Sequence, residues 1–277
     1  MALAAAMGLT YADVRVHRFP DGESRVRLPE SLPSGVIICR SLDHPNDKLI
    51  ELVLAAEEAR VLGVDTLTLV APYLCYMRQD CSFHPGEAVS QRTVGRMLAE
   101  YFNGLVTVDP HLHRVSSLEQ AAPTGHSVSL MASDPVGAFL AQELPGAVVV
   151  GPDAESEQWV SAVAARAGSD FAVGAKVRHG DRDVKIELEG DFRGRDVVLV
   201  DDMASTGRTL IVAADIIRLQ QPASVSVIVT HPLFAGDSYE RLRQAGIDNI
   251  WSTDSIPHAS NAIALAPWLA DQLRSSL

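Results

Sequence analysis

Two adjacent carboxylates, Asp201 and Asp202, follow a short apolar run, and small and hydroxyl residues come directly after them. Carboxylates accept hydrogen bonds from sugar hydroxyls, whereas hydroxyl donors and backbone N–H groups bind a phosphate. The donors that follow the carboxylates are Ser205, Thr206, Gly207 and Thr209. The pattern predicts a site that binds a phosphorylated sugar, although an ordinary strand-to-helix turn with an acidic cap would have similar spacing.

A strand and a helix must position these groups. Residues 197–200 are apolar and mostly β-branched without a gap, which predicts a strand buried on both faces. Residues 210–218 have helical spacing. The N-terminus of a helix offers unpaired N–H groups and about half a positive charge to an anion. In an open α/β sheet, ligands bind at the carboxyl ends of strands, which is where this loop is expected to lie.

Composition limits the classes of function. The chain has 277 residues, 47% of them hydrophobic, which is enough for two domains with large cores. Its net charge is −12 and it has no basic block, so we expect neither nucleic acid nor an anionic membrane as a partner. Three cysteines without metal-site spacing favour a reducing compartment, and residues 1–9 resemble neither a signal peptide nor a span. We therefore expect a cytoplasmic protein.

The loop at residues 201–209 resembles a known one. Asp-Asp-Met-x-x-Thr-Gly-x-Thr after an apolar strand is similar to the phosphoribosyl-diphosphate (PRPP) loop of type I phosphoribosyltransferases and of ribose-phosphate diphosphokinases, or PRPP synthetases. Ser205 and Arg208 stand where many members have Asp and Gly, and serine occurs in archaeal-type relatives. The resemblance implies a set of residues that bind ribose 5-phosphate: Asp201, Asp202, Ser205, Thr206, Gly207, Arg208 and Thr209.

Further motifs resemble PRPP synthetases rather than phosphoribosyltransferases. Phe-x-Asp-Gly-Glu at residues 19–23 precedes an alternating strand, and by itself it predicts only a hairpin turn. In the family this hairpin reaches into a neighbouring subunit and holds the adenine of ATP. The resemblance implies that Phe19 stacks on the base and that Asp21 and Glu23 make polar contacts to it. It also implies a homo-oligomer, at least a dimer, whose adenine site is shared between subunits.

The segment at residues 72–90 carries the longest motif. It resembles the family's Pro-Tyr-x-x-Tyr-x-Arg-Gln-Asp, followed by Pro-Gly-Glu-x-x-Ser. The resemblance implies that Arg78 binds phosphate oxygens of ATP, because a guanidinium matches their geometry. It also implies that Gln79 and Asp80 orient the nucleotide. A surface salt bridge between Arg78 and Asp80 is the simpler alternative.

Two further motifs point to Mg²⁺. Val-Asp-x-His at residues 108–111 resembles the place where the family's histidine helps to hold the Mg²⁺–ATP phosphates, which implies this role for His111. Without the resemblance, a loop histidine is the commoner interpretation. Asp153 follows an apolar strand in a match to the family's Ser-Pro-Asp-x-Gly-Gly, and its hard oxygen atoms suit Mg²⁺. Glu155 and Ser156 replace the two glycines, which we expect to crowd this loop.

Lys-x-Arg at residues 176–178 resembles a flexible loop that closes over ATP in the family. The resemblance implies that Lys176 and Arg178 neutralise the charge that builds as the bond to the α-phosphate breaks. They would then be catalytic residues together with His111. A mobile basic hairpin without a catalytic role is the alternative.

The order of strand, acidic or phosphate-facing loop and helix occurs in both halves. The resemblance implies an α/β fold with two similar type I phosphoribosyltransferase-like domains, each a mostly parallel sheet flanked by helices. We expect an ATP-side domain at residues 1–128 and a ribose 5-phosphate domain at residues 129–277, with the last helix packing back on the first half. The family's first strand is expected to be missing, because the sequence starts at the helix that follows it.

The motifs together identify the chain as a member of the shorter, archaeal-type branch of the ribose-phosphate diphosphokinase family. The implied reaction converts ATP and ribose 5-phosphate to PRPP and AMP with Mg²⁺. Two alternatives stay open. One is a phosphoribosyltransferase that uses PRPP, which the ATP-side motifs disfavour. The other is a non-catalytic homologue, which the replaced glycines and the missing strand favour.

Overall fold

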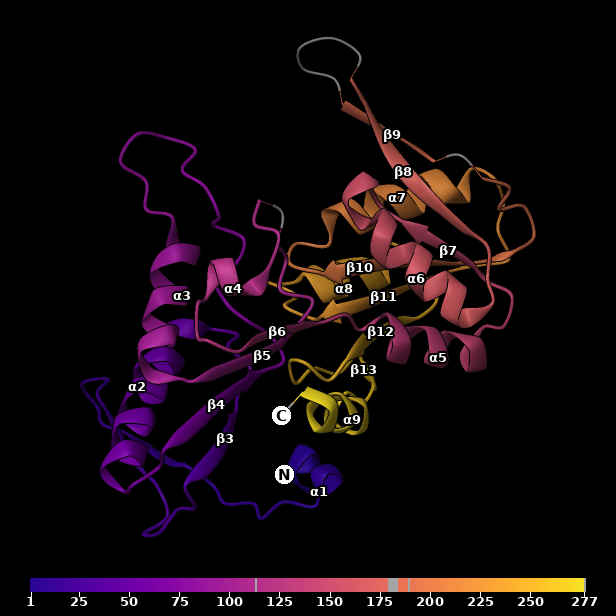
Figure 1. Ribbon diagram of the computed structural model, residues 1–277. Coiled ribbons are helices and arrows are strands. Elements are labelled where there is room, and N and C mark those ends of the chain that lie inside the picture. The colour runs from indigo at the N-terminus through magenta and orange to yellow at the C-terminus, as the bar shows by residue number, and fades with distance from the viewer. Residues whose placement is uncertain (113, 179–183, 189, 277) are drawn as a thin grey trace. The chain divides into compact units, whose positions relative to one another are not determined.

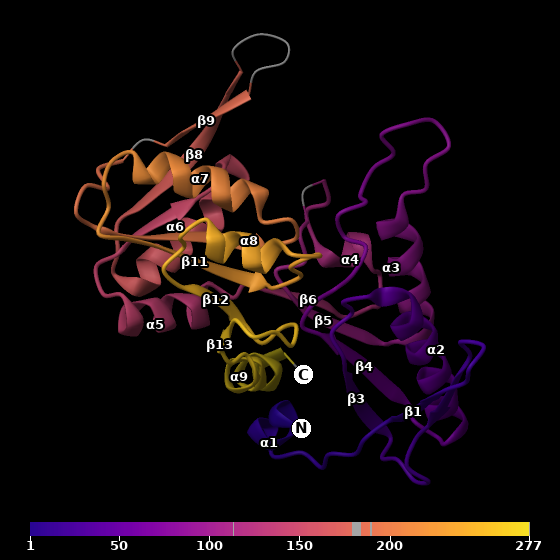
Figure 2. The same cartoon turned by 180° about the vertical axis from the view of Figure 1, so that it is seen from behind.

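A computed structural model describes residues 1–112, 114–178, 184–188 and 190–276, and at residues 175–178, 184–187 and 276 it describes the backbone alone. The chain forms two compact units, Met1–Leu130 and Met131–Leu277. Each unit contains a sheet of mainly parallel strands joined by helices (Figures 1 and 2). None of the helices in the described ranges is both long enough and apolar enough to cross a bilayer.

The first unit contains, in its described part, a two-stranded hairpin and a four-stranded sheet with the order β3-β4-β5-β6. Its elements are α1 (Ala2–Met7), β1 (Arg15–Arg18), β2 (Ser24–Arg27), β3 (Gly35–Cys39), α2 (Pro45–Val61), β4 (Thr66–Ala71), α3 (Ser90–Tyr101), β5 (Gly104–Val108), α4 (Leu118–Ala121) and β6 (Ser127–Leu130). All pairs in the sheet are parallel. The loops that carry the predicted motifs therefore leave from one edge, the carboxyl ends of the strands.

Helix α2 presents one buried side to this sheet. Leu49, Leu52 and Ala56 are buried, as their helical spacing predicts, but Ile50 is 60% exposed. The helical spacing of residues 48–62 predicts one buried side formed by Leu49, Ile50, Leu52, Val53 and Ala56, and this prediction is wrong for Ile50. Each residue turns the helix by about 100°, so Ile50 lies outside the narrow stripe that Leu49, Leu52 and Ala56 share. The buried side also contains one carboxylate, that of Glu51.

The second unit has a sheet with the strand order β13-β12-β11-β10-β7-β8-β9. Its elements are α5 (Ser133–Glu143), β7 (Val148–Gly151), the 3₁₀ turn η1 (Ala154–Ser156), α6 (Glu157–Ala167), β8 (Phe171–Arg178), β9 (Val184–Leu188), β10 (Asp196–Met203), α7 (Arg208–Arg218), β11 (Ser224–His231), α8 (Ser238–Gln244), β12 (Ile250–Thr253), β13 (Asn261–Ile263) and α9 (Ala266–Ser276). Helices α5 and α6 cover one face of the sheet, and α7 and α8 cover the other (Figures 1 and 2).

Strand β10 lies between β7 and β11 in the middle of this sheet. Its residues 197–200 are completely buried, as the unbroken apolar run predicts. The strand is longer than we predicted, because Asp201 and Asp202 belong to it and not to the following loop. The reason is tertiary: β11 continues beside it, so that Asp201 still pairs with Val229. Both carboxylates are therefore held by the sheet.

Six elements of the described residues were not predicted: α4, β6, η1, α6, α8 and β13. Helices α4 and α8 are too short to show a helical period. Strands β6 and β13 are also short, and each forms against the edge of a longer neighbour, β5 or β12.

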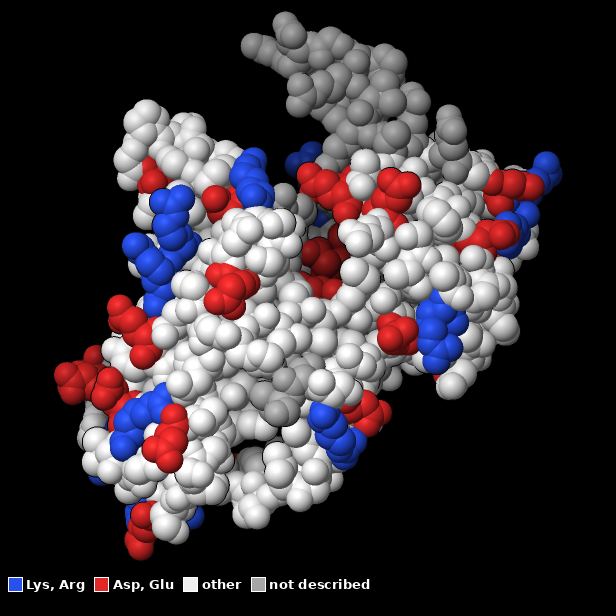
Figure 3. Space-filling model, in the orientation of Figure 1, with Lys and Arg blue, Asp and Glu red and all other residues white. Residues whose placement is uncertain are grey.

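On the face that Figure 3 shows, Lys and Arg side chains lie among Asp and Glu side chains and not in a band of one sign.

Candidate functional site

The loop between β10 and α7 is held in shape by the chain that follows β11. The carbonyls of Ala204 and Ser205 accept hydrogen bonds of 2.8 and 2.9 Å from that segment. Gly207 has a left-handed backbone with φ of 67°, and a Cβ atom there would lie 3.3 Å from the side chain of Leu242. A larger residue at position 207 would be strained by both its backbone and its neighbour.

Helix α7 begins directly after this loop, and its first intrahelical bond joins the N–H of Ile211 to the carbonyl of Gly207 at 3.0 Å. The first N–H groups of a helix have no partner within it, so they are available to an anion. Thr206, Arg208 and Thr209 are exposed beside them. Arg208 forms no ion pair within the described ranges. The geometry suits a phosphate, as the sequence predicts.

Three carboxylates meet at the ends of two neighbouring strands. Because β7 and β10 pair in parallel, Asp153 comes close enough to influence Asp201. Burial first, and then the negative charges of Asp202 and Asp153, raise the pKa of Asp201 well above its usual range. The N–H of Asp202 donates a 3.0 Å hydrogen bond to Asp201, which opposes this rise. A cation at this edge would relieve the repulsion.

These carboxylates are not by themselves a complete metal site. No group of three or more side chains that could hold a metal ion is found among the described residues. Mg²⁺ commonly binds through one or two carboxylates together with substrate phosphates, so an incomplete protein site still fits this ion. The second predicted ligand, His111, belongs to the first unit, whereas Asp153 belongs to the second.

Asp153 also caps the turn that follows it. Its Oδ1 accepts a 3.1 Å hydrogen bond from the N–H of Glu155, and its carbonyl accepts one of 2.5 Å from Ser156 Oγ. A Cβ atom on Gly151 would lie 2.1 Å from Ser156 Oγ, so the serine packs directly over that glycine. Glu155 is exposed. A capped 3₁₀ turn thus accommodates the two residues that replace the family's glycines.

The two predicted catalytic cations lie on strand β8, which pairs antiparallel with β9. The backbone of Lys176 lies opposite Ile186, and that of Arg178 lies opposite Val184. The side chains of Lys176 and Arg178 are outside the described part of the chain. Their catalytic role stays a prediction.

The loop after β4 separates Arg78 from Asp80. Arg78 is exposed and forms no ion pair within the described ranges. Asp80 is paired at 2.8 Å with Arg114, and its side chain is 4% exposed. Its second oxygen is buried and has no hydrogen-bond partner among the residues that the structure describes. The described residues thus contain no Arg78–Asp80 salt bridge. The guanidinium of Arg78 is available to an anion, while the carboxylate of Asp80 binds the guanidinium of Arg114.

The Pro-Gly-Glu part of the motif at residues 72–90 has a structural role in this loop. The carboxylate of Glu87 accepts hydrogen bonds of 2.7 and 3.0 Å from the N–H groups of Phe83 and His84. Gly86 supplies a left-handed turn with φ of 88°. Pro-Gly-Glu is therefore the local closure of the loop. Gln79 belongs to the same structure, because its carbonyl accepts a 3.2 Å hydrogen bond from Gln91.

Left-handed non-glycine residues follow three strands of the first unit. They are His44 (φ 48°) after β3, Tyr76 (63°) after β4, and Asp109 (38°) and His111 (52°) after β5. Such conformations cost about 1–3 kcal/mol each and cluster at ligand sites. The hydroxyl of Tyr76 donates to Asn46, which ties the loop after β4 to the first turn of α2. The strain marks the carboxyl edge of this sheet, where His111 lies half-buried, as the candidate nucleotide side.

The turn between β1 and β2 carries Phe19, Asp21 and Glu23, all exposed. It is closed by a 2.8 Å hydrogen bond from the N–H of Phe19 to the carbonyl of Glu23. The ring of His17 packs edge-on against Phe19, with centroids 4.8 Å apart. Within one chain, no hydrogen bond or ion pair of the described residues joins this turn to the Arg78 loop.

Three contributors to these sites were missed in the sequence. Arg114 pairs with Asp80, and Arg241 donates a 3.4 Å hydrogen bond to the carbonyl of Thr206. No motif marks either arginine. Glu51 was missed because it lies about 100° around α2 from Leu52, outside the stripe that Leu49, Leu52 and Ala56 share, and contacts with distant segments bury it.

Two family models match the chain. The N-terminal domain of ribose phosphate pyrophosphokinase matches residues 1–101, and the phosphoribosyl transferase domain matches residues 136–264. The ribose-phosphate pyrophosphokinase of Methanopyrus kandleri is 34% identical over 99% of this chain and 94% of its own. The enzyme of Halobacterium salinarum is 34% identical over 98% of this chain and 95% of its own. The enzyme of Thermococcus kodakarensis is 30% identical over 95% of this chain and 92% of its own.

A solved structure has the same fold. The phosphoribosylpyrophosphate synthetase from Mycobacterium smegmatis superposes with a TM-score of 0.85, covers 99% of this chain and 93% of its own, and is 22% identical. This likeness confirms the predicted fold class, an α/β fold with phosphoribosyltransferase-like domains of mainly parallel strands.

Proposed function

The chain belongs to the ribose-phosphate pyrophosphokinase family, and from this premise we infer that it transfers the diphosphoryl group of ATP to the 1-hydroxyl of ribose 5-phosphate. The products are PRPP and AMP. One observation carries this inference: relatives of that activity match at 30–34% identity over nearly the whole chain. A phosphoribosyltransferase acting on a nucleobase would leave the match at residues 1–101 unexplained, so that alternative is not favoured.

We place ribose 5-phosphate on the second unit. Its phosphate binds the N-terminus of α7 and the exposed hydroxyls beside it, in the loop at residues 205–209. Asp201 and Asp202 accept hydrogen bonds from the sugar hydroxyls. The support is that β10 holds both carboxylates next to this loop, and that Arg208 has no ion pair among the described residues.

We place the triphosphate of ATP on the first unit. Arg78 and His111 contact its phosphates, and Gln79 and Asp80 orient the nucleotide, with Asp80 acting through Arg114. Phe19, Asp21 and Glu23 contact the adenine bound to a neighbouring subunit. The exposure of this turn supports a site completed by a second copy of the chain, at least a dimer.

The reaction moves one diphosphoryl group in a single step. The 1-hydroxyl oxygen forms a bond to the β-phosphorus and releases its proton, and the bond from the β-phosphorus to the bridging oxygen breaks. That oxygen leaves with AMP. Positioning and electrostatic stabilisation carry most of such transfers. In the proposal, Lys176 and Arg178 stabilise the negative charge that gathers on the leaving α-phosphate.

Mg²⁺ is the proposed cofactor. Asp153 of the second unit and His111 of the first are each proposed as a ligand. Burial of Asp201, together with the negative charges of Asp202 and Asp153, raises the pKa of Asp201 and supports a cation at that edge of the second sheet. When bound, Mg²⁺ neutralises phosphate oxygens of ATP.

An assay with the purified chain, ATP, Mg²⁺ and ribose 5-phosphate tests this function by following AMP and PRPP. Formation of both is expected. Absence of AMP would favour a non-catalytic homologue, and consumption of PRPP with a free nucleobase would favour a phosphoribosyltransferase. Lys176→Ala should lower kcat about a hundredfold or more with little change in KM. The control is Lys185→Ala on the facing strand, whose backbone lies opposite Val177.

A further inference from the structure

The β1–β2 hairpin has little stability of its own. It is a sheet of two strands, separate from the sheet of its unit, and isolated hairpins are marginal in water. Arg15 lies opposite Arg27. Like charges directly opposite each other destabilise a pair of strands. The contacts between the hairpin and the rest of its unit therefore decide where its turn lies.

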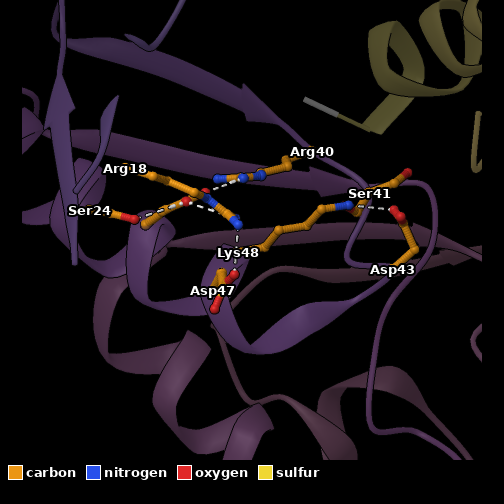
Figure 4. Close-up of polar contacts among 8 residues, drawn as sticks. Arg18, Ser24, Arg40, Ser41, Asp43, Asp47 and Lys48 are labelled. Atoms are coloured by element: carbon orange, nitrogen blue, oxygen red, sulfur yellow. Dashed lines mark hydrogen bonds and ion pairs between the residues drawn. The ribbon is translucent and has the colours of Figure 1, made fainter. Parts of the chain in front are cut away.

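Helix α2 supplies those contacts: Asp47 pairs with Arg18 at 2.9 Å, and Glu51 contacts both strands of the hairpin. The side chain of Glu51 is 1% exposed, and its Oε1 accepts hydrogen bonds from Ser24 Oγ at 3.1 Å and from Arg18 Nη2 at 3.4 Å. Figure 4 labels the partners Arg18 and Ser24 of the hairpin and Arg40 of the segment after β3. Arg18 ends β1, Ser24 begins β2, and the two are register partners. One carboxylate oxygen therefore holds both ends of the Phe19–Glu23 turn.

The second oxygen of Glu51 is tied to the central sheet. Its Oε2 accepts a hydrogen bond from the guanidinium of Arg40, which follows β3. The N–H of Arg40 donates a 2.9 Å hydrogen bond to the carbonyl of Val70 in β4. One helical turn before Glu51, Lys48 holds the loop after β3 through the carbonyl of Ser41 at 3.0 Å. The position of the hairpin is thus fixed relative to β3 and β4 of its own unit.

We propose that Glu51 is a positioning residue for nucleobase recognition, because it holds the Phe19–Glu23 turn in the place where it meets adenine. This rests on the proposed function, in which that turn contacts the base. Glu51 itself does not touch the nucleotide, since it is buried and acts through Arg18 and Ser24. Its loss displaces the turn and weakens recognition of the base, while the chemistry at the phosphates is unaffected.

Steady-state kinetics of Glu51→Gln with ATP, GTP and ribose 5-phosphate test the proposal. The KM for ATP should rise about tenfold, and the preference for ATP over GTP should fall, because small displacements of binding groups are costly. The kcat and the KM for ribose 5-phosphate should stay within about twofold. Ser24→Ala is a milder variant that removes one hydrogen bond to Glu51 and leaves the Arg18–Asp47 pair in place. It should show the same pattern to a smaller extent, and it serves as the test if Glu51→Gln does not fold.

The matched control is Glu30→Gln. Glu30 is an exposed carboxylate 3.8 Å from Arg27 of the same hairpin, at the end away from the turn, and its loss should change neither KM. A merely structural role of Glu51 would lower the melting temperature and kcat while the KM for ATP and the ATP/GTP preference stayed constant, which would overturn the proposal. If the wild-type chain forms no AMP, the proposed function fails, and calorimetric binding of ATP and GTP to the same variants decides the role of Glu51 separately.

Discussion

Asp201 and Asp153 end neighbouring strands, and the negative charge of Asp153 helps to raise the pKa of Asp201. Burial of Asp201 and the charge of Asp202 are the larger causes. Carboxylates held in such repulsion weaken the ligand-free fold and prepare a place for a cation or for sugar hydroxyls. The repulsion among these carboxylates therefore affects both the stability of the second unit and its binding of ligands, and measurements of either property can test it.

Replacing Asp201 by Asn should stabilise the ligand-free protein at neutral pH and abolish most activity. A raised folded-state pKa means that the contribution of Asp201 to stability is full below its ordinary value of 3.8 and is lost as pH rises toward the raised value. Each unit of pKa shift corresponds to about 1.4 kcal/mol. Calorimetric melting between about pH 4 and pH 8 should therefore show the variant gaining on the wild type as pH rises. A wild type that melts higher at every pH would contradict this.

Magnesium should stabilise the protein in the presence of ATP, and Asp153 should be needed for the full effect. A ligand at about 100 times its Kd stabilises the folded state by about 2.7 kcal/mol. Asp153→Asn keeps an oxygen that can accept the N–H of Glu155, so the capped turn should survive. The control is Asp237→Asn, an exposed carboxylate paired with Arg241. Equal magnesium-induced melting shifts in both variants and the wild type would remove Asp153 from the metal site.

Gly207→Ala should raise the KM for ribose 5-phosphate and lower the melting temperature. The new Cβ atom would meet the side chain of Leu242 at 3.3 Å on a left-handed backbone. The backbone strain alone costs about 1–3 kcal/mol. Gly236→Ala is a matched control, because its φ of 62° imposes the same strain while a Cβ atom there meets nothing within 4 Å. Both variants should lose stability, and only Gly207→Ala should lose affinity for the sugar phosphate.

Mixing two inactive variants tests whether the adenine site is shared between subunits. Phe19→Ala damages the turn that we expect to enter the neighbour's site, and Arg78→Ala damages the chain's own phosphate contacts. In a mixed dimer, one site combines the intact turn of one chain with the intact Arg78 of the other. Random dimers of the two chains should therefore recover about a quarter of wild-type activity. No recovery after co-expression and joint purification would indicate that each chain supplies its whole adenine site.

The motifs and the buried strand could be read from the sequence because their signals are local. An unbroken apolar run predicts β10 wherever it folds, and small residues before a helical period predict the loop at residues 205–209. The length of β10 could not be predicted in this way. Asp201 and Asp202 have the composition of a loop, and they join the strand because β11 extends far enough to pair with Asp201 and Met203 on either side of Asp202.

By itself, the sequence determined which chemical groups this protein carries and which family it belongs to. The tertiary structure decided which of these groups meet. It placed Asp153 beside Asp201, gave Asp80 the partner Arg114 in place of Arg78, and set Glu51 between the hairpin and the sheet. The physical reason is that strand order and the buried partners of a charge depend on contacts between distant segments, and no local pattern of residues specifies them.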